Sequence, residues 1–137
     1  MLPSTPIPDR TRAAMRYITL ALLLVSCNAM AGDMATRVAA GNMAMATAEG
    51  QAYDRSLAPA IQSAMMVCAP PGQPVDRFVL VGDIDTAGGL SRVAVEPATP
   101  LSRCFAEKLS AQPLPVLPRA PRGTGAYPLT VEMDVTQ

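Results

Sequence analysis

A basic segment followed by a short apolar one divides this chain and limits which residues can build its fold. Three arginines within residues 10–16 precede an uncharged stretch of 16 residues from Tyr17 to Gly32, which begins with the apolar run YITLALLLV. This order is typical of a bacterial secretion signal, in which a positively charged start stays in the cytoplasm while a short apolar helix enters the translocon. We therefore expect residues 1–26 to be a signal peptide and the later residues to form the folded part.

Two cleavage signals follow the apolar run. The residues LVSC at 24–27 resemble the lipobox of bacterial lipoproteins, in which the cysteine is acylated and becomes the new N-terminus. We therefore expect lipidation at Cys27, and the Asn28 that follows implies sorting to the outer membrane. One alternative is ordinary signal-peptidase cleavage after the AMA at 29–31. The other is an uncleaved inner-membrane anchor, although a stable spanning helix needs about 20 apolar residues.

Both cleaved forms place the protein in the cell envelope. Acyl chains contribute about 0.8 kcal/mol for each methylene buried in a bilayer, so several chains on Cys27 would make the attachment permanent. We expect a periplasmic protein anchored to the outer membrane through its lipid. From Cys27 onward the chain keeps 8 of its 11 basic and 10 of its 11 acidic residues, a net charge of −2. Because nucleic-acid binding needs clustered Lys and Arg, we expect no nucleic-acid partner.

The residue types present also exclude much catalytic chemistry. The chain holds no His, which excludes Ser-His-Asp catalysis, Cys-His catalysis and His-ligated zinc. Among the carboxylates, Asp83 and Asp85 would stand roughly 6.8 Å apart on one face of a strand, but nothing in the sequence builds a substrate cleft around them. The DIDTAG run at 83–88 departs from a calcium-binding loop at the fifth and twelfth positions. We expect a protein that is not an enzyme and holds neither a cofactor nor a metal ion.

The cysteines indicate one structural disulfide. Cys27 is acylated or discarded in the cleaved forms, which leaves Cys68 and Cys104, 36 positions apart, in an oxidising compartment. Closing a loop of this length stabilises the fold by roughly 3–4 kcal/mol in the chain-entropy model. Two free thiols or a redox-active pair are the alternatives, but the spacing is unlike C-x-x-C. We expect the pair to form a buried structural bridge.

The first half of the remaining chain predicts a tether and a helix. Residues 27–51 are rich in Ala, Gly, Met and Thr without a strong period, and we interpret them as a flexible tether. From Tyr53 to Cys68 apolar residues recur at helical spacing, which predicts an amphipathic helix. Ser56 is its expected N-cap. The helix should end at the APPG run at 69–72, because proline cannot continue the hydrogen-bond ladder.

The second half predicts three strands and another helix. Residues 77–85 alternate between apolar and polar, and 90–96 form a β-branched run after the turn residues TAGG, which together predict a hairpin. The TP pair at 99–100 is typical of a helix start. The proline-rich residues 113–122 predict a rigid connecting loop. Residues 129–135 alternate again and predict a strand with one buried face.

This order of elements resembles the C-terminal domain of the TolA/TonB group of periplasmic proteins. The resemblance covers about residues 50–136 and includes the GG pair at 88–89 and Cys104 in the second helix. It implies an α+β domain at residues 52–137 with the order α-β-β-α-β, in which two helices pack on one face of a small three-stranded antiparallel sheet. Domains of this group are non-enzymatic adaptors that often lend an exposed sheet edge to a strand of another envelope protein.

These observations predict a small envelope protein-binding module, tethered at Cys27, that docks an envelope protein of unknown identity. The 26 steps from Cys27 to Tyr53 span at most about 90 Å, too short for the periplasm-crossing linker of the energy transducers in this group. One alternative is a structural lipoprotein subunit of a larger envelope or secretion assembly. The other is an inner-membrane-anchored TonB-like protein, if the signal is not cleaved.

Overall fold

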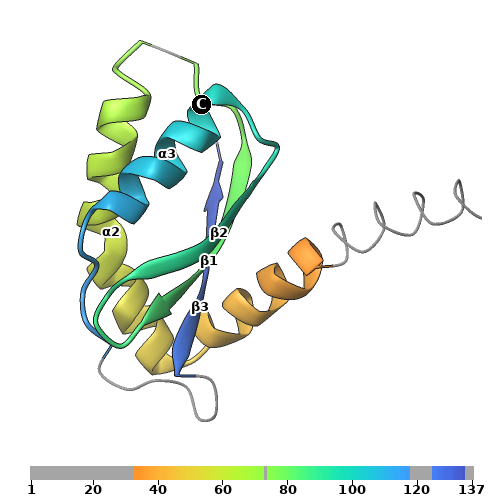
Figure 1. The fold of residues 1–137 in the computed structure, drawn as a ribbon, viewed down its shortest axis with the longest axis vertical. Helices are drawn as coiled ribbons and strands as arrows, with labels where there is room; N and C mark the ends of the chain where they lie inside the picture. The colour runs from red at the N-terminus through yellow and green to blue at the C-terminus, as the bar shows by residue number, and fades with distance from the viewer. Residues whose placement is uncertain (1–32, 73, 118–124, 135–137) are drawn as a thin grey trace, which may run out of the picture. The chain divides into compact units, whose positions relative to one another are not determined.

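The helices and strands follow the apolar patterns along the chain. The computed structural model describes residues 33–72, 74–117 and 125–134. Its main elements are α2 (Ala48–Cys68), β1 (Phe78–Asp85), β2 (Leu90–Glu96), α3 (Pro100–Ala111) and β3 (Ala126–Met133). The strands form one antiparallel sheet in the order β2-β1-β3 (Figure 1). The predicted α+β class, the three-stranded antiparallel sheet and the order α-β-β-α-β are confirmed.

Helix α2 begins earlier than the sequence pattern indicated. Thr47 is its N-cap, and the Thr47 hydroxyl oxygen accepts a hydrogen bond from the Gly50 amide at 3.0 Å. Ser56 lies inside the helix, where its hydroxyl donates to the Tyr53 carbonyl oxygen, so the expected cap at Ser56 is wrong. Ala, Glu and Gln dominate the first turns of α2, and their high helix propensity explains the longer helix. Its end at Cys68 agrees with the prediction.

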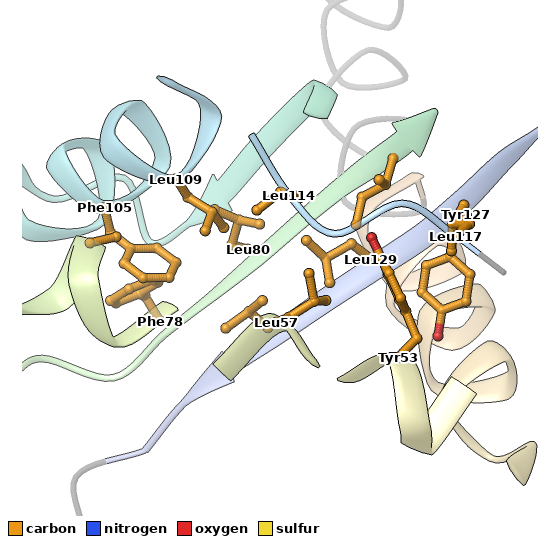
Figure 2. Packing of buried hydrophobic residues seen from close by; sticks show 13 residues of the cluster. Tyr53, Leu57, Phe78, Leu80, Phe105, Leu109, Leu114, Leu117, Tyr127 and Leu129 are labelled. Carbon is orange, nitrogen blue, oxygen red and sulfur yellow. The ribbon is translucent and has the colours of Figure 1, made fainter. Parts of the chain in front are cut away.

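One face of the sheet packs against α2 and α3 in a single hydrophobic core (Figure 2). The most completely buried side chains of this core come from β1, α2 and α3: Leu57, Phe78, Leu80, Ile84, Phe105 and Leu109. The ring centroids of Phe78 and Phe105 lie 5.3 Å apart, which joins β1 to α3. Both helices therefore cover the same sheet face, as the sequence predicted.

The Cys68–Cys104 disulfide joins the end of α2 to α3 across a Cα–Cα distance of 5.7 Å. Thr99 positions the second helix, because its side chain accepts a hydrogen bond from the Ser102 amide and the Ser102 hydroxyl accepts one from the Thr99 amide. This reciprocal capping fixes the first turn of α3. The predicted bridge between the two helices is therefore present.

The segment interpreted as a flexible tether differs from that prediction. Residues 33–45 are helical, and this helix lies against the sheet face opposite to α2 and α3. Gly41 makes the contact, since a methyl group added there would come within 2.0 Å of Thr130 Oγ1. Thr130 and its cross-strand partner Val81 are both buried on this second face. The sheet thus has apolar contacts on both faces, whereas the sequence pattern predicted one wet face.

The loop after α3 packs on the hairpin turn between β1 and β2. The Leu114 amide donates to the Gly88 carbonyl oxygen at 3.2 Å, and Leu114 and Leu117 are buried. Gly88 has a φ of 85°, and a Cβ at this position would approach the Leu114 carbonyl oxygen to 2.2 Å. Only glycine meets both requirements without strain. Residues 113–117 are thus an ordered connection, and the remaining residues 118–122 of the predicted proline-rich loop lie outside the described residues.

Candidate functional site

A groove of about 420 Å³ runs along the outer edge of β3. Four consecutive residues of β3, 130–133, contribute to its lining. Because successive side chains of a strand point to opposite faces of the sheet, four in a row can line one groove only where it follows the strand edge. The other lining residues come from the two flanking helices: Asn42, Met45, Asp54 and Ile61.

The strand at the base of the groove is an edge strand. In the order β2-β1-β3, β1 pairs with one side of β3 over all eight of its residues, from Met133 opposite Phe78 to Ala126 opposite Asp85. No strand among the described residues pairs with the other side. An edge of this kind presents backbone N–H and C=O groups that a further strand can bind.

The helix at residues 33–45 forms one wall of the groove and is held on the sheet by three contacts. Gly41 lies directly on Thr130, and the Thr130 hydroxyl donates to the Val38 carbonyl oxygen at 3.4 Å. The Arg37 guanidinium donates to the Arg92 carbonyl oxygen at 2.5 Å. Arg92 has a φ of 50° at the irregularity in the β1–β2 pairing, which presents this carbonyl to the helix. This wall of the groove therefore depends on the close approach of the helix backbone to Thr130, which only glycine at position 41 allows.

Helix α2 forms the opposite wall and is fixed through Tyr53. Its hydroxyl donates to the Pro115 carbonyl oxygen at 2.8 Å, and its ring meets the Tyr127 ring edge-on with centroids 5.1 Å apart. Figure 2 shows these two rings side by side among the core leucines. Burial, with a smaller contribution from Tyr127, raises the pKa of Tyr53 to about 12. Tyr53 is therefore a neutral hydrogen-bond donor at physiological pH.

Tyr127 carries the one buried side-chain polar atom without a hydrogen-bond partner among the described residues. The residue is only 6% exposed, and its hydroxyl has no donor or acceptor within reach. Burial, followed by the negative charge of Asp54, raises the pKa of Tyr127. The Asp54 carboxylate, which lines the groove, therefore lies close enough to influence the buried ring.

The aspartates considered for catalysis and calcium binding have other roles. Asp83 forms an ion pair with Arg92 at 3.0 Å. Asp85 shapes the hairpin turn, because its carboxylate accepts hydrogen bonds from the Ala87 and Gly89 amides at 2.9 and 2.8 Å. Both carboxylates therefore bind to residues of the β1–β2 hairpin.

The described residues set limits on other kinds of site. Among them, no group of three or more Cys, Asp and Glu side chains is arranged to hold a metal ion. No helix in the described ranges is both long and apolar enough to cross a membrane. The expected lipidation site Cys27, the signal peptide and both cleavage signals lie outside those residues. Cys68 and Cys104, the other predicted site residues, are the disulfide.

Comparisons with known proteins do not assign this chain to a family. No family model matches it, and neither the curated proteins nor the solved structures contain a detectable match. The resemblance to the TolA/TonB C-terminal domain therefore stays a prediction.

The sequence analysis missed the wall at residues 33–45, although the sequence carries a signal for it. Within this segment Gly41 is buried, and five positions are half-buried: Met34, Arg37, Val38, Ala44 and Met45. Together these positions recur at intervals of three and four. That spacing is the helical one. The pattern is weak in the sequence because its central residue is glycine, which no hydrophobicity pattern distinguishes from a linker residue.

Proposed function

We propose that this chain is a non-enzymatic binding module of the cell envelope, held at the outer membrane by a lipid on Cys27, that docks a partner protein. The observation that carries the proposal is the groove along the unpaired edge of β3, with a helix on either side. The order of elements supports an adaptor of the TolA/TonB C-terminal kind. The signal-like segment before Cys27 supports its location in the periplasm.

The docking mode that fits the groove best is the addition of a strand to β3. An extended partner segment at a sheet edge gains affinity from main-chain hydrogen bonds and selectivity from side chains that enter flanking pockets. The groove offers both, because β3 lies at its base and the two helices supply its side walls. A preformed groove also lowers the ordering cost on the side of this protein, which favours binding.

Photo-crosslinking in a bacterial host that processes the full chain tests this docking site. A photoreactive amino acid replaces Glu132, which lines the groove, and a matched control replaces Ser110, which is exposed on α3. We expect a discrete adduct from position 132 and none from position 110. With the purified partner, amide hydrogen exchange should slow over residues 129–133, because a newly paired strand protects edge amides.

Unchanged exchange over β3, or equal adducts from both positions, would overturn edge docking. If equal adducts arise within a complex of fixed stoichiometry, the alternative gains support. That alternative is a structural lipoprotein subunit of a larger envelope or secretion assembly.

A further inference from the structure

Two carboxylates from different elements line the groove without a basic partner. Asp54 comes from α2 and Glu132 from β3, and neither forms an ion pair with any described residue. By contrast, Asp83 is paired with Arg92 at 3.0 Å, and Asp134, which follows the lining residue Met133, is paired with Arg77 at 2.6 Å. Among the described residues, no Lys or Arg contributes to the lining. The lining therefore carries two carboxylates that no basic residue of the described ranges pairs with.

The remaining surface of the groove is mostly apolar and adaptable. Its apolar lining residues are Met45, Ile61, Val131 and Met133. Methionine side chains are unbranched and flexible, so they adjust to ligands of different shape. Lysine and arginine bury their methylene stems on such a surface while their charged groups reach outward. The apolar walls thus fit the methylene stem of a lysine or arginine, and the neighbouring carboxylates fit its charged group.

We infer that the groove selects an extended partner segment that presents lysine or arginine together with apolar side chains on both of its faces. This inference rests on the proposed edge docking and adds the chemistry of the partner. Along such a segment, cationic groups meet Asp54 and Glu132 while the neighbouring apolar residues contact the methionines and Ile61. An acidic segment is rejected, because like charges placed together at an interface oppose binding.

Peptide binding to the full chain tests the inference. The probes are two blocked eight-residue peptides, one in which pairs of Lys alternate with pairs of Val or Ile, so that both faces carry Lys, and one in which Glu replaces every Lys. Asp54→Asn, Glu132→Gln and the double variant are compared with Glu107→Gln, a control on the exposed face of α3. Affinity is measured by fluorescence anisotropy at two salt concentrations, and hydrogen exchange of residues 129–133 reports where each peptide binds.

We expect the Lys peptide to bind at least ten-fold more tightly than the Glu peptide and to protect β3. Each single groove variant should weaken binding about two- to five-fold, as for partly exposed ion pairs, and the control should not. Added salt should reduce the difference between the peptides.

Equal binding of both peptides with protection of β3 would overturn the charge selection and leave edge docking standing. Binding of neither peptide would also overturn the inference, and crosslinking from position 132 would then decide edge docking independently.

Discussion

At the scale of single residues, two neighbouring tyrosines use their hydroxyl groups differently. Tyr53 donates a hydrogen bond to the Pro115 carbonyl oxygen, whereas the Tyr127 hydroxyl is buried without a partner among the described residues. A buried polar group without a partner costs stability, while a satisfied hydrogen bond contributes about 1 kcal/mol. The same substitution should therefore have opposite effects at the two positions.

We expect Tyr53→Phe to lower the free energy of unfolding by about 1 kcal/mol and Tyr127→Phe to raise it by about the same amount. Both variants keep the edge-on ring contact, so each serves as the control for the other. Urea titration of the two variants beside the wild-type chain gives the comparison. If both substitutions destabilise the protein equally, the Tyr127 hydroxyl has a partner and the assignment is wrong.

At the scale of elements, the wall at residues 33–45 depends on one glycine. Gly41→Leu places a branched side chain where even a methyl group would come within 2.0 Å of Thr130 Oγ1. We expect the helix to leave the sheet, so that amides of residues 34–45 exchange much faster, while the core on the other face remains folded. Hydrogen exchange followed by mass spectrometry measures this directly.

Ala40→Leu is the matched control for the glycine substitution. Ala40 is exposed on the same helix, and leucine there has a high helix propensity. Its exchange should resemble that of the wild-type chain. Fast exchange in both variants would mean that the helix is generally unstable. Unchanged exchange in Gly41→Leu would mean that the close contact with Thr130 does not hold the wall in place.

The disulfide is a second feature that holds helices and strands together. It joins α2 to α3 and closes a loop of 36 residues, and a domain of this size has a small core that gains much from such a cross-link. We expect the Cys68→Ala/Cys104→Ala double variant to lose on the order of 3–4 kcal/mol of stability. Thermal unfolding with and without reductant gives an independent measurement. A melting temperature that reductant does not change would contradict this role.

Strong periodicity explains which elements the sequence predicted well. Phe78, Leu80 and Ile84 share one face of β1 by the two-residue period of a strand, and all three are buried in the core. Leu129 and Val131 face the same core, and Glu132 between Val131 and Met133 is exposed, as the alternation of a strand requires. The start of α2 was not predicted because Thr47 precedes weakly apolar residues, so the hydrophobic pattern begins only at Tyr53.

At the scale of the whole molecule, the candidate site could not be predicted, because three separate segments form it. Residues 42–45 and helix α2 are neighbours in the sequence, but strand β3 lies far from both and meets them only in the fold. No local sequence pattern indicates that Asp54 and Glu132 line the same groove. The sequence instead predicted the features that depend on local or compositional rules, namely the disulfide and the order of helices and strands along the chain.

Lipidation at Cys27 is a prediction that concerns the whole molecule. Several acyl chains hold a protein on a membrane far more strongly than one, so the full chain expressed in a bacterial host should be recovered from outer membranes. We expect its intact mass to match a triacylated species that begins at Cys27 and gains two hydrogens on reduction. Cys27→Ser removes the acylation site and should shift the protein to the soluble periplasmic fraction, with cleavage after Ala31.

Each other result has a distinct meaning for the molecule. A wild-type species that begins at Gly32 would contradict lipidation and make the module a soluble periplasmic protein, free to carry its groove to a partner. An uncut chain would contradict both cleavage predictions. It would favour the inner-membrane-anchored alternative, in which the helix at residues 33–45 directly follows the anchor in the sequence and is attached to the sheet through Gly41 and Arg37.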